Sequence, residues 1–405
     1  MTEALAPYHQ HLSEIAQELS ECGSQGLVVV DASSLAAIED EYGTAAYEEV
    51  RTRLLSALHE QRGKDYRQDD IIALDRPRGL RFLFFLARKR RRTQPTSLAD
   101  LRIVHDRMKR SLVANLARCA FPYRKAAPPL DVGYAMSVYN PLIHTERLVR
   151  RALRDALAMC RHLRMVERYV VRERLLDVIL RERVTTVYQP IMDLTTRQVL
   201  GFEALSRGPR GSGLEAADVL FSAASDHHLM VELDRLCRRR ALLSSGRIPS
   251  SAKLFVNTLP ATVRDPQFRG RALIDFLAQA QVSPPRIVIE ITEKLVIDNY
   301  NLFREAMAYF TDLGMSFAVD DVGAGYSGLE LIARLKPTFL KIDAALVRDV
   351  HLSVVNREMV KALIAMGRGI GAQVIAEGIQ TDGEADTLRE MGVDWGQGYL
   401  LARPE

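Results

Sequence analysis

Ser316-Phe-Ala-Val-Asp-Asp321 is a short apolar run that ends in two adjacent carboxylates. A few apolar residues in succession, bounded by polar ones, are typical of a buried strand. Similar runs recur between residues 184 and 405. We predict strands at Val187–Ile191, Val199–Leu205, Lys253–Asn257, Arg286–Ile291, Ser316–Asp320, Phe339–Asp343, Gln373–Glu377 and Asp394–Leu400.

The alternation of these strands with helices predicts an α/β fold. Helical patterns occur at Ala216–His228, Arg271–Gln281, Leu302–Leu313 and Val355–Ile370. About eight strand–helix units in a segment of this length are typical of a TIM-like (β/α)8 barrel. A doubly wound open sheet is the alternative, but no glycine-rich phosphate fingerprint follows an early strand.

Polar residues lie at or near the carboxyl ends of six predicted strands. They are Glu203, Asn257, Glu290, Asp320, Lys341 and Glu377. In a barrel all these ends open on one face, where active sites are built. One acid after a strand is commonly a helix N-cap or a surface residue, but such a set at successive strand ends predicts a shared site.

The acids expected on this face need cations. They are Glu203, Glu290, Glu293, Asp320, Asp321 and Glu377. Burying them together is too costly without neutralisation, and Lys341 supplies only one positive charge. An oxygen-rich set that includes Asn257 and lacks Cys and His suits Mg²⁺ or Mn²⁺ rather than zinc. The adjacent Asp320 and Asp321 could hold two ions about 3.5–4 Å apart, as in two-metal hydrolysis of a phosphodiester.

Five short motifs resemble those of the EAL domain family. They are Glu203-Ala-Leu205 with Ser206-Arg207, Asp320-Asp-Val-Gly-Ala-Gly-Tyr-Ser327, Leu340-Lys-Ile-Asp343, Ala376-Glu-Gly378 and Gln397-Gly-Tyr-Leu400. Their order and spacing between Tyr188 and Leu400 resemble the family pattern. Members are cyclic di-GMP phosphodiesterases on a TIM-like barrel, so the resemblance implies this fold and the formation of linear pGpG.

The resemblance also implies roles for individual residues. The implied ligands of one metal ion are Glu203, Asn257, Glu290 and Asp320. Asp320 would bridge to a second ion that also binds Asp321. Lys341 and Glu377 would orient or polarise the attacking water, and Glu293 would brace the loop after Asp321. The positions implied to contact or lie near the substrate are Gln189, Leu205, Arg207 and Gln397.

Three positions depart from the usual pattern of the family. Val322 and Ala324 stand where Phe and Thr are usual, and Gly208 stands where a Trp is common. The first two lie in a loop that the family couples to dimerisation, and the resemblance implies a homodimer.

The N-terminal part of the chain predicts a smaller domain of helices and strands. The predicted elements are a helix at Pro7–Cys22, strands at Gly26–Asp31, Asp70–Leu74, Leu80–Ala87 and Leu130–Val138, and a helix at Leu148–Arg164. Arg161–Arg183 has neither Gly nor Pro and predicts a connecting helix rather than a flexible linker. The expected divisions are residues 1–22, 23–164, 165–183 and 184–405.

Residues Gly26–Arg164 resemble a degenerate diguanylate cyclase (GGDEF) domain, which has an α+β fold. Leu27–Asp31 matches the first strand with its metal-binding Asp, but Arg76-Pro-Arg-Gly-Leu-Arg-Phe82 stands where Gly-Gly-Asp-Glu-Phe is expected. Ser33 and Glu39 replace an Asp and a guanine-reading Asn. Phosphoryl transfer needs a metal-bridged triphosphate, so we expect a regulatory or dimerising module without cyclase activity, at which a nucleotide could still bind. A generic α/β domain is the alternative and predicts the same lack of cyclase chemistry.

The composition fits a globular cytoplasmic protein. Lys and Arg number 55 against 51 Asp and Glu, and this net charge of +4 indicates neither a nucleic-acid polymer nor a membrane surface as partner. Arg88-Lys-Arg-Arg-Arg92 has no interleaved aromatics and favours a solvated loop. The apolar run near Phe82–Ala87 is too short to span a bilayer. The 4 cysteines form no Cys-x-x-Cys pair, which argues against a zinc site or a disulfide framework.

Two functions of different class stay open at this point. One is a metal-dependent phosphodiesterase of cyclic di-GMP, and the other is a non-catalytic cyclic di-GMP receptor or scaffold. A barrel enzyme of unrelated chemistry ranks third, because another substrate would have to fit the same metal cluster. Product analysis with cyclic di-GMP and Mg²⁺ or Mn²⁺ separates the first two.

Overall fold

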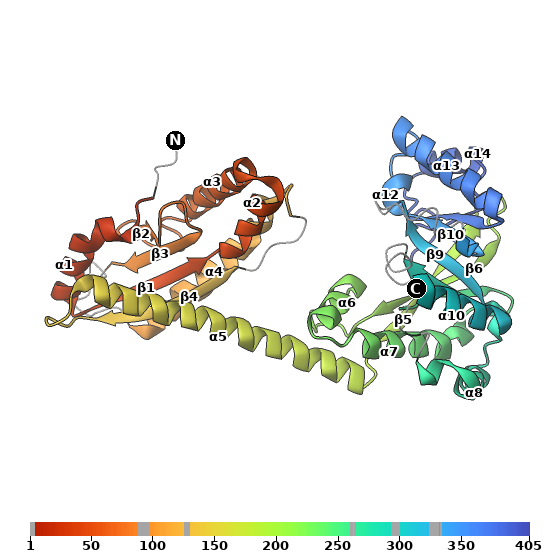
Figure 1. Cartoon of the computed structure of the whole chain (residues 1–405), viewed down its shortest axis with the longest axis horizontal. Helices are drawn as coiled ribbons and strands as arrows, with labels where there is room; N and C mark the ends of the chain where they lie inside the picture. The colour runs from red at the N-terminus through yellow and green to blue at the C-terminus, as the bar shows by residue number, and fades with distance from the viewer. Residues whose placement is uncertain are drawn as a thin grey trace. The chain divides into compact units, whose positions relative to one another are not determined.

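The chain divides into two compact units, Met1–Val170 and Val171–Glu405. The computed structural model describes residues 5–87, 97–124, 130–259, 262, 265–292, 300–323, 332 and 334–405. The basic run at residues 88–92, Glu293 and Ala324 therefore lie outside the described residues. Figure 1 shows the elements of each unit, which are described separately below. In the described part of the chain, no helix is both long enough and apolar enough to cross a membrane.

The first unit is built on a four-stranded antiparallel sheet with the strand order β2-β3-β1-β4. Its strands are β1 (Ser24–Asp31), β2 (Ile71–Leu74), β3 (Arg81–Leu86) and β4 (Asp131–Val138). All four predicted strands are confirmed, with small shifts at their ends. Val28 and Val30 of β1 pack into one core, and Leu27 and Val29 pack into another. The sheet separates these cores because successive strand residues point to opposite faces.

Helices supply the other half of each core. α3 (Thr44–Glu60) and α4 (Leu98–Ala120) pack on the side of Val28. α1 (Leu12–Cys22) and the first half of α5 (Thr145–Leu180) pack on the side of Val29. The remaining short helices of this unit in the described residues are η1 (Tyr8–His11), η2 (Ser33–Ala36) and α2 (Ala37–Tyr42).

Helix α5 confirms that Leu148–Arg164 and most of Arg161–Arg183 are helical, and it joins the two predicted helices into one. It is one continuous helix from Thr145 to Leu180, and it passes through the boundary between the two units. No Gly or Pro interrupts it, so each backbone N–H can find its partner one turn back.

The second unit is a closed barrel with the strand order β10-β11-β12-β5-β6-β7-β8-β9. This closure confirms a TIM-like barrel over an open sheet. The strands are β5 (Thr185–Asp193), β6 (Val199–Arg207), β7 (Lys253–Asn257), β8 (Ile287–Thr292), β9 (Ser316–Val322), β10 (Phe339–Ile342), β11 (Gln373–Ala376) and β12 (Trp395–Gly396).

Strand β5 differs from the predicted series of strand–helix units. It runs antiparallel to both of its neighbours, β6 and β12. The loop between β5 and β6 covers only residues 194–198, whereas a parallel crossover needs about a dozen residues. Asp193 Oδ1 accepts hydrogen bonds from the amides of Thr195 and Thr196 and closes this turn. The barrel therefore begins with a hairpin.

Strand β12 is also shorter than the predicted strand Asp394–Leu400. It ends at Gly396, and the chain then turns, because the amides of Leu401 and Ala402 donate to the carbonyl of Gly398. Gln397 keeps one strand-like bond, from its amide to the Ala376 carbonyl. This bond holds Gln397 at the mouth of the barrel.

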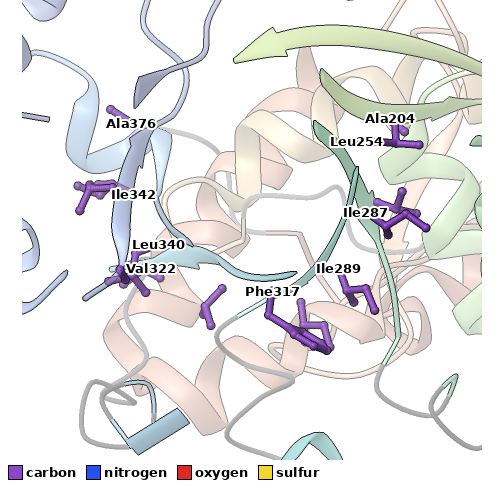
Figure 2. Close-up of a cluster of buried hydrophobic side chains, with 14 of the residues drawn as sticks. Ala204, Leu254, Ile287, Ile289, Phe317, Val322, Leu340, Ile342 and Ala376 are labelled. Carbon is purple, nitrogen blue, oxygen red and sulfur yellow. The ribbon is translucent and has the colours of Figure 1, made fainter. Parts of the chain in front are cut away.

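Helices pack around the barrel, and strand residues alternate between two apolar layers. The helices are α6 (Ala217–Asp226), α7 (Met230–Leu243), α8 (Gly270–Ala280), α10 (Tyr300–Asp312), α12 (Ala344–Val347), α13 (Val354–Ile370) and α14 (Asp382–Glu390). Figure 2 shows side chains of the outer core, among them Leu254, Ile289 and Leu340. The residues next to them in sequence point inward and fill the barrel, for example Phe255, Val288 and Phe339.

Candidate active site

A polar layer lies above the apolar filling of the barrel. On five strands an inward apolar residue is followed two positions later by a polar residue: Phe255 by Asn257, Val288 by Glu290, Ala318 by Asp320, Phe339 by Lys341 and Ile375 by Glu377. Because side chains two positions apart on a strand share a face, these polar groups point to the same interior. The alternation of each strand thus builds the site one layer above the core.

Lys341 on β10 is the centre of this layer. Its side chain is 0% exposed. Its Nζ lies near one oxygen from each of four carboxylates: 2.6 Å from Glu377 Oε1, 2.8 Å from Glu290 Oε1, 3.2 Å from Asp320 Oδ1 and 3.4 Å from Glu203 Oε2. One positive charge therefore faces four acids drawn from four different strands or strand ends.

The raised pKa values in the cluster show that its carboxylates outnumber the positive charge beside them. Burial opposes the charge of Lys341, but the surrounding carboxylates raise the pKa of its ammonium well above the usual value. Burial raises the pKa of Glu290 and of Glu377 well above that of an ordinary carboxyl, against the pull of Lys341. Burial, and then repulsion from Asp320, raises the pKa of Asp321 to about 6. The cluster favours additional cations.

Two amides tie the carboxylates together. Asn257 Nδ2 donates to Glu203 Oε1 at 3.0 Å and to Glu290 Oε2 at 3.2 Å. Gln397 Nε2 donates to Glu203 Oε2 at 2.7 Å and to Gln189 Oε1 at 3.0 Å. Both oxygens of Glu203 are thus oriented by neutral donors, one at the end of β7 and one just after β12.

A bulge in β9 brings Asp320 and Asp321 to the same site. In a regular strand these neighbours would point to opposite faces. Val319 pairs with Leu340 but Val322 pairs with Ile342, so β9 has one extra residue at this point. Asp321 adopts φ 56°, in the left-handed region that residues other than glycine seldom adopt. The bulge redirects the second carboxylate toward the first.

Two overlapping groups of acids could hold metal ions. They are Glu203 with Glu290 and Asp320, and Asp320 with Asp321 and Glu377. In each group, one oxygen from every residue lies within 4.8 Å of the others. Asp320 belongs to both groups, which suits a carboxylate that bridges two ions. These oxygen donors and their excess negative charge fit a pair of hard divalent cations.

Two cavities border the acidic cluster. One, of about 320 Å³, is lined by Gln189, Glu203, Asp320, Ala344, Glu377, Gly378, Gln380, Gln397, Gly398 and Tyr399. The other, of about 500 Å³, is bordered by Asn257, Glu290 and Asp321 at the cluster and extends to Phe221 and Asp234 on α6 and α7. A ligand with two similar halves could therefore place its centre over the acids.

Most of the residues predicted from the sequence come together in this site. Gln189, Glu203, Asn257, Glu290, Asp320, Asp321, Lys341, Glu377 and Gln397 all belong to the cluster or line one of its cavities. Leu205 lines the larger cavity. Arg207 lies at the end of β6, where its Nη1 donates to the Ser206 carbonyl at 2.8 Å. Glu293 lies outside the described residues.

The sequence prediction missed the polar wall of the larger cavity. Asp234 and Arg238 of α7 belong to that wall, although both are almost fully buried. A signal for them exists in the sequence: an Asp and an Arg four positions apart lie on a helix face shared with Leu233 and Cys237. Opposite charges on an apolar face indicate a buried ion pair rather than a solvated one.

The sequence of the barrel is similar to a known family of domains and to curated proteins. The model of the EAL domain family matches residues 172–404. Among curated proteins, the "Probable cyclic di-GMP phosphodiesterase PdeD" of Escherichia coli K12 is 31% identical over 223 residues, 53% of this chain and 40% of that protein. The "Signaling protein YkoW" of Bacillus subtilis is 27% identical over 238 residues, 56% of this chain and 29% of that protein. The matched region thus spans less than half the length of each relative.

Two solved structures share the fold. The "PaMucR Phosphodiesterase, c-di-GMP complex" has a TM-score of 0.51 at 23% identity and covers 58% of this chain and 96% of its own. The FimX EAL domain of Xanthomonas citri, in complex with c-diGMP, has a TM-score of 0.55 at 21% identity and covers 60% of this chain and 96% of its own. At these identities the likeness supports the barrel fold itself.

Proposed function

This chain belongs to the EAL domain family, and from that premise we propose that its barrel hydrolyses cyclic di-GMP to linear pGpG with two bound Mg²⁺ or Mn²⁺ ions. The observation that carries the proposal is the set of five carboxylates that surround one cation, Lys341, in the described part of the barrel. A relative described as a probable cyclic di-GMP phosphodiesterase, 31% identical, supports the choice of substrate. A non-catalytic cyclic di-GMP receptor is the second candidate.

We assign the ligands of the two ions from the two acidic groups. Glu203, Asn257, Glu290 and Asp320 would hold one ion, and Asp320 and Asp321 would hold the other. Bound divalent ions supply a lowered pKa for water and withdraw charge from a phosphodiester. Asn257 Nδ2 donates hydrogen bonds to Glu203 and Glu290. Its Oδ1 is therefore the atom that we propose as the ligand of the cation.

Lys341 and Glu377 are the groups proposed to act on the attacking water. Their contact of 2.6 Å fixes the Glu377 carboxylate, whose other oxygen is left to accept a hydrogen bond from water. Lys341 also holds Asp320, Glu290 and Glu203 in place and balances part of their charge. Glu293 is proposed as a brace for the loop after Asp321.

The two cavities support a substrate with two nucleotide halves. Gln189 and Gln397 border the smaller cavity, and Leu205 borders the larger one. Arg207 follows Leu205 on the same strand face, since the two are two positions apart. A guanidinium there suits a phosphate oxygen pair of the dinucleotide.

The experiment is a product analysis with the full chain. The protein is incubated with cyclic di-GMP and either Mg²⁺ or Mn²⁺, and the nucleotides are separated by chromatography. Appearance of pGpG, and its absence with the Glu203→Ala variant, supports the proposal. Tight binding of cyclic di-GMP without linear product from either ion would establish the receptor instead.

For the first unit we propose a degenerate GGDEF-like module that regulates or dimerises the protein without making cyclic di-GMP. Asp31 Oδ2, at the end of β1, lies 2.9 Å from Arg81 Nε, and Asp75 Oδ2 lies 3.5 Å from Arg81 Nη1. The acid that a cyclase would use for metal is therefore already paired with a cation.

We further propose that the protein is a cytoplasmic homodimer, which analytical ultracentrifugation of the full chain would test.

A second incubation tests the cyclase part of this proposal. The full chain with Glu203→Ala, which cannot destroy the product, is mixed with GTP and Mg²⁺. No cyclic di-GMP should accumulate, and its accumulation would contradict the proposal. A change of wild-type hydrolysis on adding GTP would favour a regulatory nucleotide site.

A further inference from the structure

A buried ionic cluster lies beside the barrel on α7, outside the acidic site. Its members are Asp234, Arg238 and Asp265, which are 4%, 2% and 5% exposed, together with the more exposed Arg235. Two acids and two arginines balance each other, so this cluster needs no further ion. The cluster lies next to residues that follow β7, and this position suggests a structural role near the metal site.

Asp234 holds the segment that follows β7. Its Oδ1 accepts a hydrogen bond from the Leu259 amide at 3.1 Å, and its Oδ2 accepts one from Thr262 Oγ1 at 2.7 Å. Leu259 is only two residues after Asn257, the last residue of β7. The helix therefore fixes the backbone immediately beyond a proposed metal ligand.

Asp265 anchors the other end of the same segment. Arg235 donates to it with two nitrogens, Nε to Oδ2 at 2.9 Å and Nη2 to Oδ1 at 3.1 Å. Asp265 in turn caps the short helix η5 (Pro266–Phe268) by accepting from the Gln267 amide at 3.0 Å. Residues of α7 thus contact Leu259 and Thr262 after β7 and Asp265 before η5.

Arg238 joins the two anchors. Its Nε donates to Asp234 Oδ2 at 2.9 Å, and its Nη2 lies 3.6 Å from Asp265 Oδ2. The guanidinium lies over the Phe268 ring, 4.3 Å from its centroid, which fixes its plane. Arg238 also forms part of the wall of the larger cavity, together with Asn257 and Thr258.

The segment is also tied to the acidic site directly. The Thr258 amide donates to the carbonyl of Glu290 at 3.0 Å, and Asn257 Nδ2 donates to the Glu290 side chain. A shift of Thr258 and Leu259 would therefore move Asn257 relative to Glu203 and Glu290. Outer contacts of this kind commonly tune metal affinity because they orient the ligand.

We propose that Arg238 is a positioning residue for the metal site: through its ion pairs with Asp234 and Asp265 it keeps Leu259 and Thr262 in place after β7, so that Asn257 presents its oxygen to the bound ion. This inference rests on the proposed two-metal function of the barrel. It goes beyond that function because it assigns a role to a residue that is not among the proposed ligands of either ion.

The test measures Mn²⁺ binding by isothermal titration calorimetry as well as hydrolysis, using the full chain. Arg238→Met should weaken Mn²⁺ binding by about tenfold, the lower range for an outer contact. Thr262→Val, which removes one hydroxyl from Asp234 at nearly constant volume, should weaken it by a smaller factor. In both variants the loss of turnover should be recovered at saturating Mn²⁺, because the ligands themselves are intact.

Arg286→Met is the matched control. Arg286 also ties a loop to the barrel, donating to the carbonyls of Ala252 and Pro249 at 3.1 Å and 3.0 Å, but it precedes β8 at the opposite end of the strands. It should lower thermal stability without changing Mn²⁺ affinity. If the Arg238 and Thr262 variants fold and bind Mn²⁺ as the wild type does, the inference is wrong. A wild-type protein that neither binds Mn²⁺ nor hydrolyses cyclic di-GMP would contradict the proposed function itself.

Discussion

Both units of this protein carry acids at the ends of their central strands, but the two groups of acids differ in how many side-chain cations lie beside them. In the first unit, Asp31 and its cross-strand neighbour Asp131 lie near Arg81 and Arg164, with Asp75 also beside Arg81. Three carboxylates there share two arginines. In the barrel, Lys341 faces four carboxylates and Asp321 adds a fifth beside Asp320, and no second cation pairs with this cluster among the residues that the structure describes.

The difference teaches how to distinguish a structural acid from a site acid. Where side-chain cations nearly match the acids, each carboxylate already contacts a cation, and an added metal ion gains little. Where one buried ammonium faces many carboxylates, folding leaves an electrostatic cost that only an external cation or bound protons can relieve. Balance within the cluster is therefore more informative than the presence of acids.

The largest effect should come from removing the shared ligand of the barrel. Asp320→Asn should lower turnover of cyclic di-GMP by more than about a hundredfold, since even outer contacts of a metal cost up to that factor. Steady-state hydrolysis with Mn²⁺ measures it. Asp31→Asn, the corresponding change in the balanced cluster, should leave turnover unchanged. Equal turnover of the two variants would mean that the acids of the barrel are no more important for hydrolysis than those of the first unit.

The next effect concerns the counter-charges themselves. Lys341→Met should destabilise the metal-free barrel by about 3–5 kcal/mol, because it leaves buried carboxylates without a partner. Arg81→Met should cost about 1 kcal/mol, since Arg81 is one third exposed and its pair is partly screened. Chemical denaturation in EDTA measures both. Similar losses would mean that the lysine is no more essential to its cluster than the arginine.

Added metal should separate the two units by stability. Mn²⁺ at a hundred times its Kd should stabilise the folded barrel by about 2.7 kcal/mol by mass action, and EDTA should reverse this. The unfolding of the first unit should not respond. Glu203→Ala should remove the stabilisation, because it takes a ligand from one of the acidic groups. Thermal unfolding followed by calorimetry is the measurement, and a shift in the first unit alone would contradict the assignment.

The smallest effect is a pH dependence in the balanced cluster. Burial opposes ionisation of Asp31, but hydrogen bonds from Ser33 and Arg81 outweigh it and hold the pKa of this carboxyl below its usual value. A lowered pKa contributes stability that is present above the unfolded-state pKa of about 3.9 and is lost as the pH falls through the folded value. The stability difference between wild type and Asp31→Asn should therefore be constant at neutral pH and shrink below about pH 4. A difference that grows on acidification would contradict this account.

The strands and the polar layer of the barrel could be predicted from the sequence because both depend on local patterns. An inward apolar residue followed two positions later by a polar one, as in Phe339 and Lys341, follows directly from the period of a strand. The hairpin of β5 was also within reach, since residues 194–198 are too few for a parallel crossover. The prediction missed it by assuming a regular repeat of strand–helix units.

Three features were decided only by the tertiary structure. The bulge that turns Asp321 toward Asp320 depends on pairing between β9 and β10. The central place of Lys341 depends on carboxylates that approach from other strands. The contacts of Asp234 with Leu259 and Thr262, and of Arg238 with Asp265, depend on α7 packing beside β7. Sequence spacing determines which face of a strand or helix a side chain occupies, but its partners come from distant segments, and only the packed chain brings them within bonding distance.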